Sequence, residues 1–378
     1  MFFLLLPGLI CLYLFLRLLL PLPLRPRWKL ALGSLLPLIC LQQFLLRLFF
    51  GNGPTIEMPA FAVLLSGWSF ASMLLLFCLT LGTDILLLAR RLLRPKAKPS
   101  PTSGPLSPGR RQALLALLAI APAAYGASKV MHSPEVFRLE ARLPRLPRAL
   151  DGLTLAQISD LHASSLLQEK WIRLVVEKTN ALKPDLILLT GDIVDGLPEA
   201  RRTDVLPLRE LRAGLGVFGC AGNHEYYSHF DSWMKRFPDL GVDMLLNRHA
   251  TLSLDGEKLV LAGVTDLVAD RYKLPLPNVS AALAGSPEEG VRILLKHRPA
   301  GQEARLAGVD LQLSGHTHGG QILLLDQVVA RFNQGYLRGW YQMGDMGLYV
   351  SSGAGLWSGM PVRLGVPSEI ALLTLRRG

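Results

Sequence analysis

Long apolar runs fill the first third of the chain. Four of them lie at residues 2–24, 30–50, 60–89 and 112–131. The first run has neither the basic start nor the small-residue cleavage site of a secretory signal. Because a membrane-spanning helix needs about 20 mostly apolar residues, the pattern predicts an α-helical transmembrane region of about four spans at residues 1–131.

The pattern changes near residue 150, where short apolar stretches begin to alternate with segments of helical spacing. Strands are expected at residues 153–158, 185–190, 216–220, 292–296, 310–313, 348–351 and 370–375, with a hairpin at 250–264. Helices are expected at residues 169–182, 204–211 and 229–240. This alternation predicts an α/β domain at residues 150–378, and the hairpin favours a mixed sheet or two packed sheets.

The net charge of +11 belongs to the apolar third of the chain. Residues 1–131 hold 13 Lys or Arg and 2 Asp or Glu, whereas the remainder holds 27 of each sign. The basic residues flank the apolar runs, as they do where charge sets membrane orientation. We therefore expect the lipid bilayer as a partner and no nucleic acid.

The basic residues also predict an orientation. They lie between the first and second runs and in a basic Pro/Ser/Gly linker at residues 93–111, but the segment between the second and third runs has none. Positive segments stay cytoplasmic, so the α/β domain is expected outside the cytoplasm, on a multi-pass protein of a bacterial inner membrane. Basic residues after the fourth run count against this orientation. Arg110 and Arg111 before the fourth run also resemble a twin-arginine export signal, although an ordinary span is the simpler interpretation.

Few ionisable or thiol groups lie inside the apolar runs. Arg17 is interpreted as a snorkelling or helix-packing residue and Asp84 as a helix-end residue, rather than as parts of a transport path. Three cysteines lie in the apolar runs, and Cys220 lies in a predicted strand as an inert thiol. Their spacing predicts neither a disulfide nor a zinc knuckle.

Polar residues follow five of the predicted strands directly. In chain order they are Asp160, His162, Asp192, Asp195, Asn223, His224, His297, His316 and His318. Ligands of open α/β sheets bind beyond the carboxyl ends of the strands. Oxygen and imidazole donors without thiolate suit Mn, Fe or Zn in a reactive site better than a structural zinc site.

The ordered motifs D-x-H (160–162), GD-x-x-D (191–195), GNHE (222–225), His297 and GH-x-H (315–318) resemble the calcineurin-like metallophosphoesterase superfamily. The resemblance covers about residues 151–375. GVTD (263–266) and YVSSGAG (349–355) are similar to bacterial membrane-linked phosphodiesterases, and the order of spans followed by this domain is similar to transmembrane proteins with a metallophosphoesterase domain. The resemblance implies a β-sandwich flanked by helices that acts as the catalytic domain.

The resemblance also implies the role of each polar residue. One divalent metal would be held by Asp160, His162 and His318, and a second by Asn223, His297 and His316, with Asp192 bridging both. A hydroxide bridging the metals would attack phosphorus, with His224 as the acid and Asp195 orienting it. Glu225 is expected to be structural rather than catalytic.

Several functions fit this expectation. A membrane-anchored, dinuclear-metal-dependent phosphodiesterase is favoured, with a lipid-linked or cell-envelope phosphoester as its candidate substrate. A UDP-diacylglucosamine-type pyrophosphatase and a phosphoprotein phosphatase stay open as alternatives. A non-catalytic metal-binding envelope sensor is the alternative from another class, and a transporter is disfavoured by the few ionisable residues in the spans. Trp340, Tyr341 and Trp357 would either stack on a ligand or lie at the membrane interface.

Overall fold

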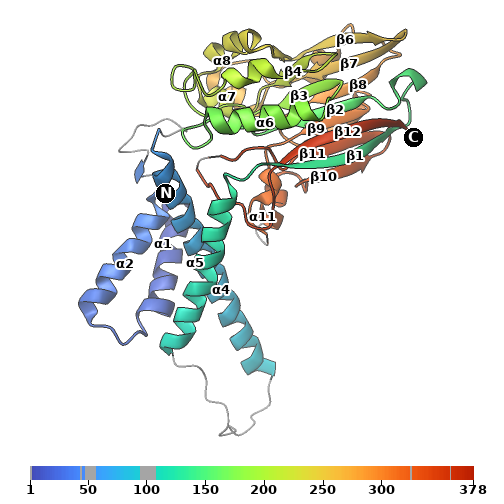
Figure 1. The fold of residues 1–378 in the computed structure, drawn as a ribbon. Helices are drawn as coiled ribbons and strands as arrows, with labels where there is room; N and C mark the ends of the chain where they lie inside the picture. Colours follow the sequence, from blue (N-terminus) through green and yellow to red (C-terminus); the bar gives the residue numbers. More distant parts are fainter. Residues whose placement is uncertain (1, 43–44, 47–56, 94–107, 324–325, 358) are drawn as a thin grey trace. The chain divides into compact units, whose positions relative to one another are not determined.

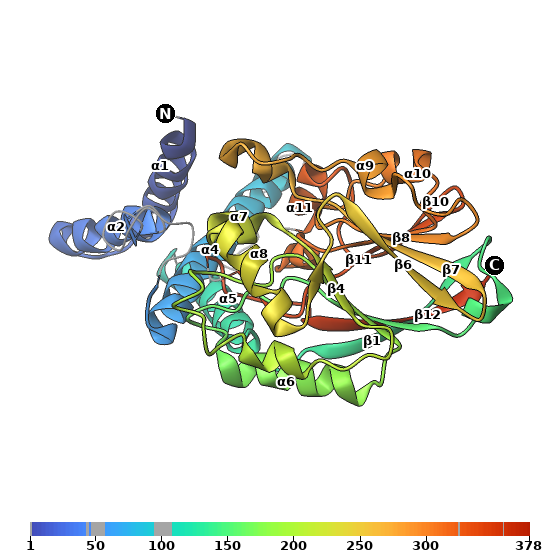
Figure 2. The same cartoon turned by 90° about the horizontal axis from the view of Figure 1, so that it is seen from above.

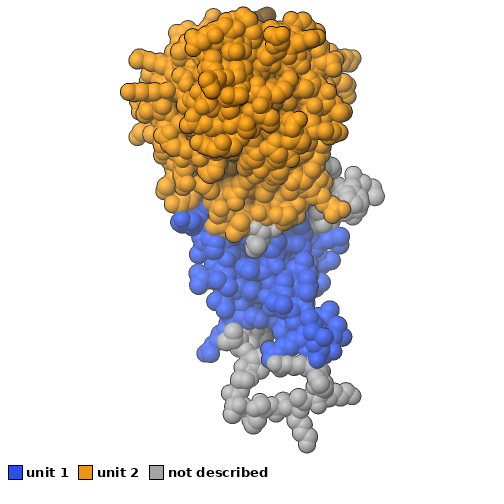
Figure 3. All heavy atoms as spheres, turned by 90° about the vertical axis from the view of Figure 1, so that its right-hand side faces the viewer, with its two compact units in different colours: residues 1–52, 61–128, 359–362 blue, residues 53–60, 129–358, 363–378 orange. Residues whose placement is uncertain are grey.

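The computed structural model describes residues 2–42, 45–46, 57–93, 108–323, 326–357 and 359–378. The chain divides into two compact units, coloured separately in Figure 3. Unit 1 comprises residues 1–52, 61–128 and 359–362, and unit 2 comprises residues 53–60, 129–358 and 363–378.

Unit 1 is helical. Its helices are α1 (Phe2–Leu14), continued by a π-helical turn at Phe15–Leu19, α2 (Pro26–Cys40), α4 (Ala60–Leu93) and α5 (Pro108–Lys129) (Figure 1). Each predicted run overlaps one of these helices. Among the described residues only α4 is both long and apolar enough to cross a membrane, by length and composition. The end of the second run lies outside the described residues, so the four spans stay a prediction.

Arg17 and Asp84 form an ion pair inside unit 1. Arg17 Nε donates to Asp84 Oδ2 at 2.6 Å, its Nη2 donates to Oδ1, and Tyr13 Oη donates to Oδ2 at 2.8 Å. Asp84 lies within α4, nine residues before its end at Leu93, and is therefore not a helix-end residue. The two ionisable residues interact with each other, as charges within apolar helices generally must.

Unit 2 contains two six-stranded mixed sheets. In spatial order the first is β1 (Glu135–Leu143), β12 (Glu369–Arg377), β2 (Thr154–Ile158), β3 (Leu186–Thr190), β4 (Val217–Cys220) and β5 (Asp243–Met244). The second is β10 (Gly339–Met343), β11 (Met346–Val350), β9 (Leu311–Ser314), β8 (Val291–Leu295), β7 (Glu257–Gly263) and β6 (Arg248–Leu254). Strands β2 to β5 are mutually parallel, as are β11, β9, β8 and β7.

The two sheets share one apolar core. Leu155 and Leu188 of the first sheet belong to the same buried cluster as Leu261, Ile293 and Leu313 of the second. Both faces of the central strands are covered, and β3 (LILLT) is buried at every position, which explains its continuous apolar sequence. The expectation of an α/β domain with two packed sheets is confirmed.

Helices connect the strands of unit 2. They are α6 (Glu169–Ala181), α7 (Asn223–Tyr227), α8 (Phe230–Arg236), α9 (Val279–Leu283), α10 (Gln302–Leu306) and α11 (Asp326–Phe332). Figure 2 shows α6 on one side of the sheets and α9 and α10 on the opposite side. The helix predicted at residues 204–211 was wrong in type, because Leu206–Glu210 form a short 3₁₀ turn that contains Pro207.

Strand β1 was not predicted. It pairs in parallel with β12 over its full length, so the first sheet includes residues before the expected boundary at 150. From Phe137 onward its sequence EVFRLEARL carries apolar residues at every second position, of which Ala141 and Leu143 are buried. This is the period of a half-buried strand. Its basic residues, Arg138 and Arg142, therefore belong to a strand and not only to the flank of the fourth apolar run.

Candidate metal centre

The nine predicted site residues lie directly after β2, β3, β4, β8 and β9, strands that belong to both sheets. The structure brings these five connections together. Three overlapping groups of donor atoms result, each with its atoms within 4.8 Å of one another. They are Asp160, His162 and His318; Asp192, His297 and His316; and His162, Asp192 and His224.

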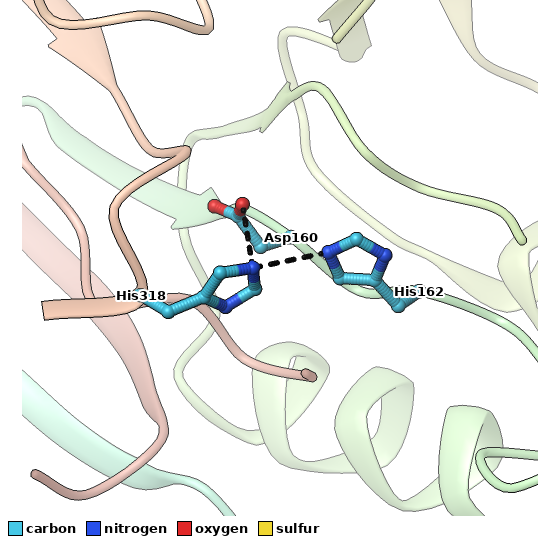
Figure 4. Close-up of side chains that lie close together, drawn as sticks. All are labelled: Asp160, His162 and His318. Atoms are coloured by element: carbon cyan, nitrogen blue, oxygen red, sulfur yellow. Dashed lines mark hydrogen bonds and ion pairs between the residues drawn. The ribbon is translucent and has the colours of Figure 1, made fainter. Parts of the chain in front are cut away.

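The first group combines one carboxylate and two imidazoles (Figure 4). His162 Nε2 lies 3.2 Å from His318 Nε2, and His318 Nε2 lies 3.5 Å from Asp160 Oδ1. All three side chains are buried. Two ring nitrogens that face each other this closely need a proton or a cation between their lone pairs.

The second group consists of Asp192, His297 and His316. Its carboxylate also lies near His162, a member of the first group. Asp192 Oδ2 lies 3.1 Å from His297 Nε2 and 3.8 Å from His162 Nε2. His316 Nδ1 lies 3.3 Å from His297 Nε2. A single oxygen of Asp192 therefore lies between the histidines of the two groups, the place that a bridging ligand would need.

The donors fit divalent cations. Asn223 is buried, and its Oδ1 has no hydrogen-bond partner among the described residues. A buried carbonyl oxygen without a partner is costly unless it binds a ligand. Imidazole and oxygen donors together suit Mn, Fe or Zn. These His/Asp clusters are typical of the dinuclear site of calcineurin-like phosphoesterases.

Left-handed backbone conformations orient most of these donors. The φ angles are 52° at Asp160, 48° at His162, 52° at Asp192, 74° at His316 and 49° at His318. Such a conformation costs a non-glycine residue roughly 1–3 kcal/mol and recurs at functional sites, where the surrounding fold compensates for it. Here it turns each side chain sharply at the end of a strand.

Two glycines of the motifs let these connections approach one another. A Cβ on Gly315 would lie 1.9 Å from Ser159 Oγ and 2.2 Å from Asp160 Oδ2. A Cβ on Gly222 would lie 2.2 Å from Asp192 Oδ1. Any side chain at either position would displace a carboxylate of the site, which gives a steric reason for glycine there.

Backbone and hydroxyl groups hold the two carboxylates in place. Asp160 Oδ2 accepts from Ser159 Oγ at 2.6 Å, and both its oxygens lie 3.1 Å from the backbone nitrogen of His316. Asp192 Oδ1 accepts from the backbone N–H of His224 at 2.8 Å. The second oxygen of Asp192 is left to face the histidines.

Asp195 and His224 form a buried pair beside the two groups. His224 Nδ1 donates to Asp195 Oδ1, and Asp195 Oδ2 lies 3.2 Å from His162 Nδ1. Burial alone would raise the pKa of Asp195, but the two histidines hold it below its usual range. Burial alone would lower the pKa of His224, but Asp195 and Asp192 raise it to about 9. Near neutral pH the pair is therefore a carboxylate and an imidazolium.

Three further residues contribute to the site. The Tyr227 and Trp357 rings lie 5.2 Å and 6.1 Å, centroid to centroid, from the His224 ring. Arg298 Nη1 lies 3.2 Å from His316 Nε2. The sequence offered a signal for Arg298, which directly follows His297. Of the two interpretations of Trp357, its contact with the His224 ring fits a place at the site.

The other aromatic candidates and the thiol pack elsewhere. Trp340 packs against the core between the two sheets, and Tyr341 packs against a second apolar cluster that includes Leu348. Cys220 is fully buried, and burial raises the pKa of its thiol well above the usual value. A buried, protonated thiol of this kind is unreactive.

Comparisons with known proteins agree with this geometry. The family model of the calcineurin-like phosphoesterases matches residues 153–320. The transmembrane protein with metallophosphoesterase domain of Danio rerio is 32% identical over 278 residues, which cover 71% of this chain and 63% of that protein. The metallophosphoesterase YkuE of Bacillus subtilis is 34% identical over 240 residues, which cover 61% of this chain and 82% of that protein.

The chain spans less than two thirds of the Danio rerio protein and of its relatives in Bos taurus and Helicobacter pylori. The match to YkuE nevertheless extends over most of that protein's length, and the family motifs come together at one buried site. The chain therefore belongs to the calcineurin-like phosphoesterase family.

Proposed function

We propose that the chain hydrolyses a phosphodiester with the help of two divalent cations, Mn, Fe or Zn. The observation that carries the proposal is the shared oxygen of Asp192 between two buried groups of donors, with the paired side chains of His224 and Asp195 beside them. One cation would be held by Asp160, His162 and His318, and the other by Asn223, His297 and His316. Asp192 would contact both.

Each residue then has a chemical task. Two bound cations supply the positive charge that neutralises the phosphoryl oxygens and eases the attack of water. His224 donates its proton to the leaving oxygen, a step typically worth about 10²–10⁴ in rate. Asp195 keeps the His224 ring protonated and aimed through Nδ1, so that Nε2 is the donating atom. Ser159 and Glu225 hold the ligands rather than react.

Preference for a diester is supported by the sequence resemblance to membrane-linked phosphodiesterases. The test is hydrolysis of bis-p-nitrophenyl phosphate and p-nitrophenyl phosphate by the detergent-solubilised chain, with Mn²⁺ and with EDTA. We expect metal-dependent turnover, faster on the diester, that is lost in Asp192→Asn and His224→Ala. The control is His249→Ala, because this half-buried histidine of β6 lies outside all three donor groups.

The outcomes separate the remaining candidates. Faster turnover of the monoester would favour a phosphomonoesterase, such as a phosphoprotein phosphatase. Turnover of neither ester but of a nucleotide-linked lipid diphosphate would favour the pyrophosphatase. Metal binding without any hydrolysis would favour the non-catalytic sensor and contradict the proposal.

We further propose that the four apolar runs cross a membrane and leave unit 2 outside the cytoplasm. The location of basic residues between the runs and the apolar length of α4 support this arrangement. In that position the substrate would be a lipid-linked or envelope phosphoester. A reporter enzyme that is active only outside the cytoplasm should be active when it is fused after Gly378. If that fusion is inactive and the same reporter is active when fused after Arg91, the orientation is the reverse of the one proposed.

A further inference from the structure

Arg298 is anchored at one edge of its guanidinium. Its Nε lies 2.8 Å and 3.1 Å from the two carboxylate oxygens of Asp266. The Asp266 side chain is 1% exposed, whereas that of Arg298 is 31% exposed. Asp266 is itself held in place, because its Oδ1 accepts from the backbone N–H of Val268 at 2.9 Å. The Nε edge of the guanidinium is therefore fixed by a buried carboxylate that is itself held in place.

The other edge of Arg298 faces the metal centre. Its Nη1 lies 3.2 Å from His316 Nε2. A guanidinium can only donate, so His316 Nε2 accepts this hydrogen bond. The single proton of the neutral ring then lies on Nδ1, the nitrogen that faces His297 Nε2 at 3.3 Å.

This hydrogen bond is incompatible with metal binding by His316. Nδ1 is the ring atom that faces His297, which in turn contacts Asp192. A ring that bound a cation through Nδ1 would carry its proton on Nε2. Two N–H donors would then face each other across 3.2 Å. Arg298 Nη1 must turn away and find another acceptor, while Nε stays bound to Asp266.

The partner of Arg298 is also linked to the helix that carries His224. Asp266 caps the 3₁₀ turn Leu267–Tyr272, and Val268 and Ala269 of this turn share a buried cluster with Tyr226 of α7. The Tyr227 ring contacts the His224 ring. An acceptor that Arg298 meets in the loaded site would therefore lie beside both the donors of the second group and His224.

Building on the proposed function, we propose that Arg298 binds a non-bridging oxygen of the substrate's phosphate group. Arginine presents planar paired donors that match a phosphate. Asp266 acts as the positioning residue that keeps the guanidinium aimed. The group recognised is the phosphoryl group itself, whatever alcohol it carries.

Phosphate binding tests this assignment without turnover. The solubilised full chain, loaded with Mn²⁺, is titrated with inorganic phosphate in a calorimeter, and bound Mn²⁺ per chain is measured in parallel. We expect Arg298→Ala to weaken phosphate binding about tenfold to hundredfold with unchanged Mn²⁺ content, since hydrogen bonds to charged groups are strong. Arg298→Lys should be intermediate. Arg305→Ala, which removes an exposed arginine of α10, should bind phosphate like wild type.

A rescue experiment separates contact with phosphate from support of the fold. Millimolar guanidinium should restore part of the lost phosphate affinity to Arg298→Ala and leave wild type unaffected. Asp266→Asn should weaken phosphate binding in the otherwise unchanged chain but add little when Arg298 is already alanine, because its effect acts through Arg298.

Three results would overturn the proposal. The first is that metal-loaded Arg298→Ala binds phosphate as tightly as wild type. The second is that the variant loses Mn²⁺ while its loaded fraction keeps normal phosphate affinity. The third is that guanidinium does not restore phosphate binding to the variant. Failure of the proposed function looks different, because wild type would then bind phosphate through Arg298 but hydrolyse neither nitrophenyl ester.

Discussion

Glu225 Oε2 lies 3.0 Å from the backbone nitrogen of Asp192, which joins the connection after β4 to the connection after β3. The same carboxylate accepts from the backbone N–H groups of Gly222 at 2.6 Å and Ile193 at 2.7 Å. Glu225 is fully buried and meets only backbone donors in these bonds. It thereby fixes the segment that carries Asp192, the carboxylate between the two donor groups.

We expect Glu225→Gln to weaken metal binding about 10- to 100-fold, as is typical when a residue supporting a metal ligand is changed. The reason is that the amide places a second donor against backbone N–H groups and loosens the turn at Asp192. An equilibrium titration with Mn²⁺ measures this change in affinity. Glu289→Gln, at an exposed position, is the matched control. Equal Mn²⁺ affinity in both variants would contradict this role of Glu225.

Asp195 contacts Nδ1 of two histidines, His162 and His224. Asp195→Asn keeps the shape of the side chain but removes the charge that holds His224 protonated. We expect kcat on the diester to fall about 10²–10⁴-fold at saturating Mn²⁺, the usual value of a general acid. Asp231→Asn, an exposed change in α8, should leave kcat unaltered. If the Asp195→Asn variant loses Mn²⁺ but keeps its kcat per metal-loaded site, Asp195 supports only the proposed metal ligand His162 and not the proposed acid His224.

Tyr349 provides a pH-dependent contribution to stability away from the site. Its buried hydroxyl donates to Glu369 Oε1 at 2.8 Å, and burial together with Glu369 raises the pKa of the phenol. A raised pKa means that the protonated phenol stabilises the fold below its ordinary pKa of about 10. This stability is lost as the pH rises above that value.

Tyr349→Phe should therefore lower the free energy of unfolding by about 1–3 kcal/mol at pH 7.5, because Glu369 loses a donor. Between pH 9.5 and 11 the variant should lose less stability than wild type. Thermal or denaturant unfolding of the solubilised chain at several pH values checks both. Tyr272→Phe, at an exposed tyrosine, is the control. Parallel stability curves for wild type and Tyr349→Phe would contradict the assignment.

The pair of Arg17 and Asp84 joins helical segments 67 residues apart. Either single change, Arg17→Ala or Asp84→Ala, leaves one charge without its partner in apolar surroundings. We expect the double variant to be more stable than the sum of the single effects predicts, with a coupling of roughly 0.5–3 kcal/mol. The coupling is obtained from the free energies of unfolding, in detergent, of wild type, the two single variants and the double variant. Strict additivity would mean that the pair contributes nothing to the packing of unit 1.

Much of the site was predictable because its signals are local. A buried strand is recognised by its apolar run, and the residue that follows the run must lie at its carboxyl end. Asp160, Asp192, Asn223, His297 and His316 all follow strands in this way. Parallel strands place those ends at one edge of a sheet, so the motifs predicted a shared site before any contact was known.

Other features depend on contacts between distant segments. The strand β1 was missed although its alternation is visible, because its pairing with β12 joins the two ends of unit 2. The ion pairs of Arg298 with Asp266 and of Arg17 with Asp84 have no fixed spacing that a pattern could reveal.

The sequence by itself determined which polar residues follow the strands and which strands carry them, because both follow from periodicity and from the residue types at strand ends. The tertiary structure decided how they combine: which histidines face each other, which oxygen of Asp192 lies between them, and which arginine is aimed at the centre. Left-handed backbone at Asp160, His162, Asp192, His316 and His318 sets those directions. These conformations are unfavourable locally, and only packing across both sheets stabilises them.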